Sequence, residues 1–255
     1  MVDASWLDRH GYGTSLRSKY VAAGWLEKPA SRVFRRPGGR LEWQQVVISL
    51  QTILDHPLIV GGRTALELQG FSHYLSRAIR EVHLYGLKAP PTWLDKLKLE
   101  ARFKYHNIGR LFRNDPITRG IGALKWNVES SSSDSITPIS WGTSEWPLTL
   151  STPERAILEL LDELPKNESF HEADMLMEGL SNLRPRRLQR LLTDCKSVKV
   201  KRLFFFFAER HHHTWLKQLD RTPIDLGKGK RLIQPGGKLD KAFQITVPED
   251  LIGIS

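Results

Sequence analysis

The sequence predicts an α+β protein in which an N-terminal winged helix-turn-helix is followed by a larger mixed domain. Three observations favour this fold class. Residues 4–36 have the pattern of a helix, a turn, a second helix and a basic hairpin. Residues 41–150 mix helical spacing with strict apolar and polar alternation, and residues 151–220 are mainly helical. Residues 221–255 form a tail of short strands separated by glycines. We therefore predict two domains, residues 1–40 and 41–255.

The first domain is predicted from residue types at its turns. Ala4 to His10 forms a short helix, and Thr14 is placed to cap the second helix. Gly24 can adopt the left-handed conformation that ends it. Trp25 follows as part of an apolar plug, before a hairpin over residues 27–36. A winged helix usually has one more helix before these two, so we expect either a trimmed start or a later segment covering that face. The alternative interpretation is a small helix and hairpin packed on a larger domain.

The second domain begins with a helix over residues 42–54, whose apolar residues have helical spacing. The run Ser151-Thr152-Pro153-Glu154 predicts the start of a later helix, over residues 151–164, by three signals: a hydroxyl cap, Pro in the first turn and an acid near the positive dipole end. The other predicted helices cover residues 64–69, 90–97, 171–180, 185–195 and 203–219. Strands are predicted over residues 58–60, 81–85, 99–106, 123–128, 136–141, 146–150, 224–226, 231–233 and 243–247, with a serine-rich loop over 130–135.

Composition limits the class of protein. The chain has 255 residues and a formal net charge of +10, which raises the expectation of a polyanionic partner. Cys195 is the one cysteine, which excludes a disulfide framework and a cysteine-based zinc site. We interpret it as structural and expect a cytoplasmic protein. No apolar run is long enough to span a bilayer, so no membrane partner is expected.

Two patterns invite a catalytic or metal-binding interpretation. Gly61-Gly62, a helix and then a strand is the layout of a nucleotidyltransferase, which needs two acids on that strand. Here the strand offers Glu81-Val82-His83, a poor site for Mg²⁺ because this ion prefers oxygen ligands. His211 to His213 are adjacent on a predicted helix and cannot converge on one metal ion. We predict no enzyme activity, no metal and no cofactor, with an active or degenerate nucleotidyltransferase kept as an alternative.

Basic residues are concentrated in two stretches. The first comprises Arg17, Lys19, Arg32, Arg35, Arg36 and Arg40. The second comprises Arg184, Arg186, Arg187, Arg190, Lys196, Lys199, Lys201 and Arg202, which Lys228, Lys230 and Arg231 could extend. The second is interpreted as either a solvated face or an anion-binding surface for nucleic acid or an acidic partner.

Several fragments in order resemble the AbiEi family of antitoxins and transcriptional regulators from bacterial type IV toxin–antitoxin systems. The resemblance rests on residues 18–27 (SKYVAAGWLE), 32–38 (RVFRRPG), 60–70 (VGGRTALELQG) and 151–161 (STPERAILELL), and on four short C-terminal fragments within 224–248. Each fragment alone is unspecific, whereas the ordered set covers nearly the whole chain.

The resemblance implies a winged helix that binds inverted repeats in the promoter of its own operon. It also implies a C-terminal antitoxin domain that opposes a nucleotidyltransferase-like toxin in abortive infection, without requiring a direct complex. The residues predicted to contact DNA are Ser15, Arg17, Ser18, Lys19, Arg32, Arg35, Arg36 and Arg40. The predicted antitoxicity surface comprises Arg184, Arg186, Arg187, Arg190, Lys199, Lys201 and Arg202. A plain winged-helix transcription factor without a toxin partner is the alternative.

Overall fold

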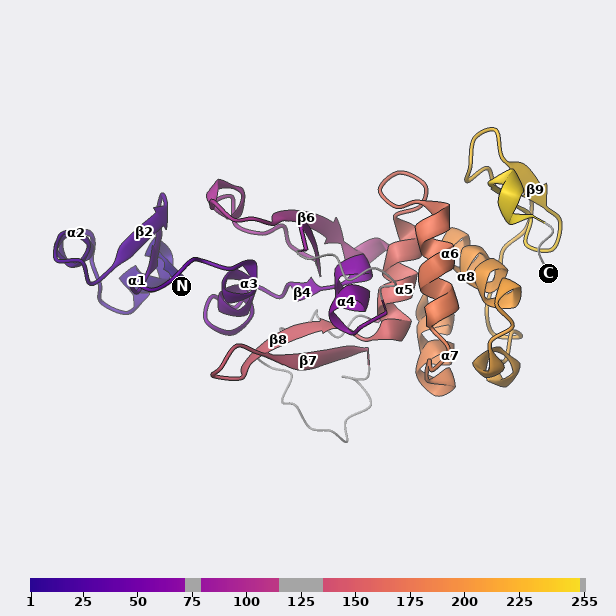
Figure 1. Cartoon of the computed structure of the whole chain (residues 1–255), viewed down its shortest axis with the longest axis horizontal. Helices are drawn as coiled ribbons and strands as arrows, with labels where there is room; N and C mark the ends of the chain where they lie inside the picture. The colour runs from indigo at the N-terminus through magenta and orange to yellow at the C-terminus, as the bar shows by residue number, and fades with distance from the viewer. Residues whose placement is uncertain (72–78, 115–134, 253–255) are drawn as a thin grey trace.

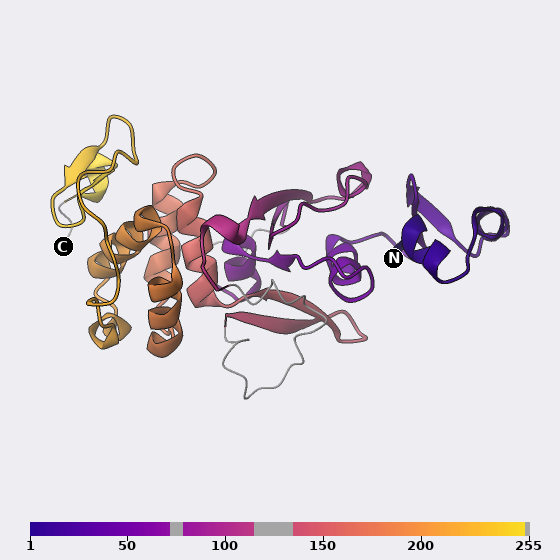
Figure 2. The ribbon, with the colours of Figure 1, turned by 180° about the vertical axis from the view of Figure 1, so that it is seen from behind.

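The computed structural model describes residues 1–71, 79–114 and 135–252. Figure 1 shows an elongated molecule with the N-terminal domain at one end, a mixed sheet in the middle and a helical layer beyond it. Figure 2 shows the same order from behind, with the C-terminal tail at the end opposite the N-terminal domain. The predicted α+β class is confirmed. The predicted strand 123–128 lies outside the described residues, as does most of the predicted loop 130–135.

The N-terminal domain contains the predicted helix, helix and hairpin, together with one strand that the sequence did not reveal. Its elements are β1 (Val2–Asp3), α1 (Ala4–Arg9), α2 (Thr14–Ala22), β2 (Glu27–Ala30) and β3 (Val33–Arg35). The strand order is β1-β3-β2, so β1 pairs with the second strand of the hairpin. Ala4, Leu7 and Phe34 form a small core between the helices and this sheet.

The middle of the chain forms a five-stranded sheet of order β6-β5-β4-β8-β7. β4–β8 and β5–β6 are parallel pairs, and the other two pairs are antiparallel. The elements here are α3 (Trp43–Thr52), β4 (Ile59–Val60), α4 (Gly62–Leu68), β5 (Glu81–Gly86), η1 (Leu94–Lys96), β6 (Arg102–Asn107), η2 (Ile108–Arg110), β7 (Ile136–Trp141) and β8 (Trp146–Ser151).

The helical layer and the tail follow. Their elements are α5 (Pro153–Asp162), α6 (Phe170–Gly179), α7 (Pro185–Asp194), α8 (Val198–Arg210), η4 (Thr214–Gln218), β9 (Lys238–Asp240), β10 (Ile245–Val247) and η5 (Glu249–Leu251). α5 begins at Pro153, close to the predicted start, with Thr152 at the N-cap position. The predicted hydroxyl cap is not formed, because the side chain of Thr152 binds no backbone N–H.

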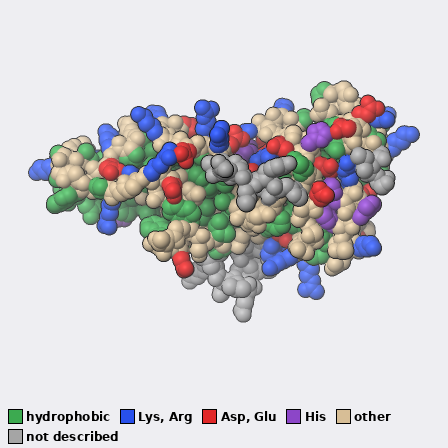
Figure 3. Space-filling model, in the orientation of Figure 1, with side chains coloured by type: hydrophobic (Ala, Val, Ile, Leu, Met, Phe, Trp, Pro, Cys, Tyr) green, Lys and Arg blue, Asp and Glu red, His purple; other side chains and the backbone are tan. Residues whose placement is uncertain are grey.

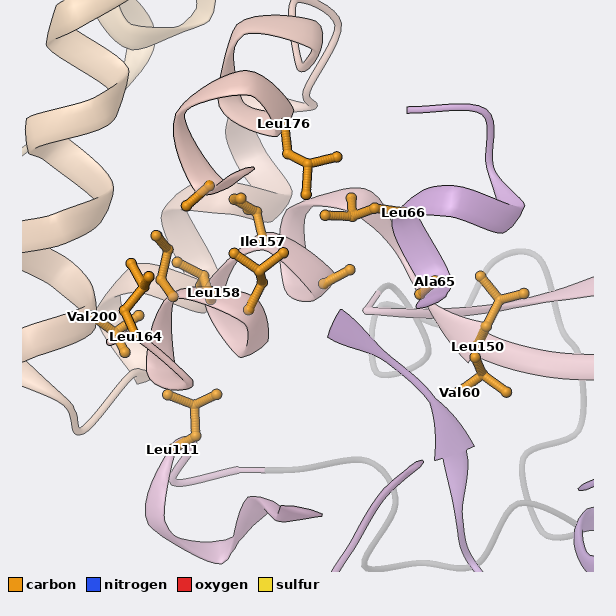
Figure 4. Close-up of a cluster of buried hydrophobic side chains, with 14 of the residues drawn as sticks. Val60, Ala65, Leu66, Leu111, Leu150, Ile157, Leu158, Leu164, Leu176 and Val200 are labelled. Carbon is orange, nitrogen blue, oxygen red and sulfur yellow. The ribbon is translucent and has the colours of Figure 1, made fainter. Parts of the chain in front are cut away.

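A large apolar core joins the sheet to the helices. Figure 4 shows Val60 and Leu150 of the sheet beside Ala65 of α4, with Leu66, Ile157 and Leu176 continuing the cluster between α4, α5 and α6. α5 is buried along most of its length, since Ala156 to Leu161 are all buried. Among the described residues, no helix has the length and apolarity needed to cross a membrane.

Four predicted elements differ from the structure. The predicted helix over 90–97 is only the short 3-10 turn η1, because Pro90 and Pro91 lack the N–H groups that a helix needs. The predicted helix over 203–219 instead begins at Val198, where Ser197 caps it, and ends at Arg210, before His212 adopts a left-handed φ of 49°. In the tail, residues 224–226 form no strand and Arg231 makes an isolated bridge with Ile245. β9, which pairs with β10, was not predicted.

Candidate nucleic-acid interface

Helix α2 presents a polar face to solvent. Gly13, rather than the predicted Thr14, is its N-cap residue. The helix ends before Gly24, which has the predicted left-handed backbone with φ of 74°. Ser15, Ser18 and Lys19 are exposed on it. The hydroxyl of Ser15 and the ammonium of Lys19 can donate hydrogen bonds to phosphates and to base edges, whereas the hydroxyl of Ser18 donates to the carbonyl of Thr14 and can still accept.

Arg17 does not belong to this exposed face, and its burial corrects the prediction that it contacts DNA. Its side chain is held inside the domain. The guanidinium donates to the carbonyls of Ala4 (3.2 Å) and Tyr12 (2.8 Å) and to the hydroxyl of Thr14 (2.9 Å), and it also forms an ion pair with Asp8. Arg17 therefore joins α1, the turn and α2, and orients the helix that carries Lys19.

The hairpin after α2 has the shape of a wing. Ala30 and Val33 are paired, so Ser31 and Arg32 form its two-residue turn. Arg32 is exposed at this turn, in a left-handed conformation with φ of 63°, and Arg36 is exposed just after β3. These two arginines can approach a phosphate backbone beside a groove occupied by α2.

The other two arginines predicted for the wing are engaged within the protein. Arg35 donates to Glu27 (2.6 Å) and to the carbonyls of Gly38 (3.2 Å) and Gly39 (2.9 Å), so it stabilises the wing and the segment that follows. Arg40 remains exposed but pairs with Glu100 at 2.5 Å, which joins the segment after the wing to the segment before β6. Their roles are better described as positioning than as direct DNA contact.

An aromatic surface continues from the end of α2. Trp25, predicted to be part of an apolar plug, is instead 66% exposed. Its ring lies 5.3 Å from that of Tyr20, which lies 6.3 Å from that of Tyr12. The sequence carries no signal for this exposure, because an apolar residue directly after a helix-ending glycine often packs back on the helix. Exposed aromatic rings beside a basic helix are suited to contact sugars and bases.

The second predicted basic surface is smaller in the structure than the sequence suggested. Arg184, Arg186 and Arg190 are exposed at or along α7, whose leucines 188, 191 and 192 are buried. Arg187, in contrast, turns toward α5 and donates to Glu154 at 2.9 Å. Glu154 also accepts the backbone N–H of Arg184 at 2.8 Å, so this buried carboxylate fixes the start of α7.

Three residues predicted for this surface are corrected because α8 begins earlier than expected and is largely buried. Lys199 donates to the carbonyls of Asp162 and Leu164 at the end of α5. Lys201 is buried, and so is Arg202, whose guanidinium binds backbone carbonyls of the tail. Burial also raises the pKa of Cys195 to about 11, which keeps it a thiol and agrees with a structural role.

The region that resembled a nucleotidyltransferase site is a closed polar network. Gly61 and Gly62 are buried against Tyr85 and Glu159, and a side chain at Gly61 would clash with both. His83 contacts His106 at 3.0 Å and Glu81 at 3.1 Å. Within the ranges that the structure describes, no group of three or more His, Cys, Asp or Glu side chains is arranged to hold a metal ion.

The histidine run at the end of α8 is also engaged within the fold. His211 binds Asp174 at 2.7 Å, and His213 is buried with a ring nitrogen 2.7 Å from the carbonyl of Met177. The prediction that all three histidines lie on a helix is wrong, because α8 ends at Arg210, before His211.

An N-terminal winged helix with an exposed polar helix and a basic wing, joined to a larger α+β domain, defines the class of transcriptional regulators. Two family models match the chain. Residues 1–77 match the AbiEi antitoxin N-terminal domain, and residues 80–248 match the transcriptional regulator and AbiEi antitoxin of type IV toxin–antitoxin systems. The chain therefore belongs to the AbiEi family, as its resemblance implied. The family models meet near residue 78, whereas the predicted boundary at residue 40 follows the end of the wing.

The fold is also found in a solved structure. The RV2827C protein from Mycobacterium tuberculosis is similar with a TM-score of 0.54 and 12% identity, over 94% of this chain and 82% of that one. At this identity the likeness concerns the fold alone. A comparison with curated proteins finds no match.

Proposed function

We propose that this regulator represses its own operon by binding inverted repeats in the promoter. α2 would enter the major groove with Ser15, Ser18 and Lys19, while Arg32 and Arg36 contact the adjacent phosphates. The single observation that carries this proposal is the exposure of these five side chains on one helix and its wing, while Arg17 and Arg35 are bound within the domain. Such a regulator would act in the cytoplasm.

Replacing Lys19 and Arg36 with Ala is expected to weaken binding to the upstream DNA by about tenfold per residue, because each substitution removes a cation that faces a phosphate. The slope of log K against log[salt] should fall by about one for each phosphate that is no longer neutralised. A gel shift over a salt series measures both quantities. Lys96→Ala, at an exposed position far along the chain, is the matched control. If the double variant and the control bind equally, α2 and the wing are not the DNA-binding face.

We further propose that the C-terminal domain opposes a nucleotidyltransferase-like toxin through the surface formed by Arg184, Arg186 and Arg190. Support comes from the exposure of these side chains on α7, one of whose faces is committed to the core. The surface is separate from the winged helix, so regulation and toxin neutralisation can be tested independently. A direct complex with the toxin is not required for this proposal.

Charge reversal at Arg186 and Arg190 is expected to abolish rescue when the protein is co-expressed with its toxin, while operator binding stays unchanged. The measurement is growth after toxin induction, with protein levels compared by immunoblot. Lys96→Glu with Lys98→Glu gives the same change in net charge at two other exposed positions and should leave rescue intact. Full rescue by the Arg186 and Arg190 variant would exclude this surface.

A further inference from the structure

The loop over residues 226–231 carries positive charge that neither proposal above uses. It belongs to the tail, at the end of the molecule opposite the winged helix (Figure 2). Lys228, Lys230 and Arg231 are exposed, and Figure 3 shows Lys and Arg side chains at both ends of the molecule. Within the described part of the chain, none of these three side chains has a carboxylate within ion-pairing distance.

The conformation of this loop is fixed by hydrogen bonds from the buried side chain of Arg202. Arg202 is 3% exposed and donates to the carbonyls of Leu226 (2.6 Å), Gly229 (2.7 Å) and Gln244 (3.1 Å). The N–H of Arg231 donates to the carbonyl of Gln244 at 2.9 Å, and so ties the end of the loop to the tail. Because Arg202 binds three backbone carbonyls, it restricts the backbone conformations that the loop can adopt. The exposed cations are therefore presented on a preorganised loop, which lowers the entropic cost of binding.

The backbone of the loop supplies further donors. Gly229 adopts a left-handed φ of 76°, and its carbonyl faces Arg202. Across residues 1–71, 79–114 and 135–252, no group accepts a hydrogen bond from the N–H groups of Lys228, Gly229 and Lys230. The acidic residue of the segment, Asp225, accepts the N–H of Gly227 at 2.7 Å. Cationic side chains interleaved with open N–H groups suit an anion with several acceptor oxygens.

We propose that this loop binds the phosphodiester backbone of a nucleic-acid strand, as a second nucleic-acid contact separate from the winged helix. Each phosphate offers a charge for Lys228, Lys230 or Arg231 and acceptor oxygens for the open N–H groups. Leu232, which is 73% exposed directly after the cations, adds an apolar surface against which a sugar or base can pack. An acidic polypeptide also carries acceptors for the cations and for the N–H groups, so polyglutamate is the competing probe in the test.

The test replaces Lys228, Lys230 and Arg231 with Gln in the full chain, and measures fluorescence anisotropy with two nucleic-acid probes and with labelled polyglutamate over a salt series. One probe is a single-stranded RNA of about 20 nucleotides, a length chosen to cover one such site. The other is duplex DNA from the upstream region. The control replaces Lys88, Lys96 and Lys98 with Gln, which removes the same charge from other exposed positions.

The expected result is that the loop variant binds at least one probe about tenfold or more weakly, with a salt slope reduced by about two, while the control is unchanged. The probe that responds identifies the source of the phosphates. A loop variant that binds both probes as tightly as the control does would overturn the proposal. So would a loop variant that no longer binds polyglutamate but binds both nucleic acids unchanged. Because the RNA arm does not depend on the winged helix, failure of operator binding would not be mistaken for failure of this loop.

Discussion

Replacing Glu159 with Ala is expected to lower the free energy of unfolding by about 3–5 kcal/mol, because it removes the carboxylate that compensates a buried arginine. Arg155 and Glu159 lie one turn apart on α5, 1% and 0% exposed, with Nε of Arg155 2.7 Å from Oε1 of Glu159. The other carboxylate oxygen accepts the N–H of Gly62 at 2.9 Å and the hydroxyl of Ser151 at 2.8 Å. Glu159 thus joins the sheet, the Gly61-Gly62 turn and the helical layer.

Urea denaturation followed by far-ultraviolet circular dichroism measures this effect. Glu178→Ala, at an exposed position on α6, is the control and should change stability by less than about 0.5 kcal/mol. The double variant Arg155→Met and Glu159→Leu should recover only part of the stability. A packed apolar pair can replace the buried ion pair, but the N–H of Gly62 and the hydroxyl of Ser151 lose the carboxylate that accepts from them. If Glu159→Ala is as stable as the control, the carboxylate does not organise this junction.

Stability should also fall as the solution is acidified below pH 6.5, because of His83. Burial, followed by the nearby charge of His106, lowers the pKa of His83 from 6.5 to about 4. Below pH 6.5 the unfolded chain binds a proton that the folded chain does not bind until about pH 4. The free energy of unfolding is therefore unaffected by His83 well above pH 6.5 and decreases as the pH falls. Relative to its value at high pH, the decrease is about 2 kcal/mol at pH 5 and about 3 kcal/mol at pH 4.

The measurement compares urea denaturation at about pH 7 and about pH 5 for the natural chain, His83→Gln and His212→Asn. Between pH 7 and pH 5 the free energy of unfolding of His83→Gln should fall by about 2 kcal/mol less than that of the natural chain. His212 is exposed and has a left-handed backbone that Asn tolerates, so its variant should behave like the natural chain. Equal pH dependence in all three proteins would show that His83 is not kept neutral by burial. Glu81 and Glu168 lie near the ring of His83, and the charges of Lys104 and Glu163 also act on it, so the comparison is made between variants rather than from one curve.

The ends of helices were predicted well from the sequence where they are set by a few neighbouring residues. Pro153 marks the start of α5 and Gly24 the end of α2, because a first-turn proline and a left-handed turn depend on a few adjacent residues. β1 was missed because a two-residue strand carries no periodic pattern and exists only through its partner β3. The start of α8 was placed too late because Lys199, Lys201 and Arg202 look solvent-facing until the partners that bury them are known.

The candidate interfaces were predicted in outline but not residue by residue. By charge alone, Arg17 cannot be distinguished from Lys19, nor Arg35 from Arg36. In the structure Arg17 and Arg35 are hydrogen-bonded within the protein, whereas Lys19 and Arg36 are exposed. Which arginine turns inward depends on acceptors from distant segments, such as the carbonyl of Ala4 for Arg17. The polar network around Glu159 was also missed, because its members come from α4, α5 and three strands and share no sequence motif.

Recognition of its own promoter through α2 and the wing is the centre of the function proposed for this AbiEi-family chain. The most direct measurement is the ratio of its affinities for the upstream DNA and for a scrambled duplex of the same length and composition, at physiological salt. Specific regulators typically bind their sites at least about 10³-fold more tightly than other DNA, and we expect a ratio of that order. Equal affinity for the two duplexes would contradict promoter recognition, because it would leave only non-specific attraction between a basic protein and a phosphate backbone.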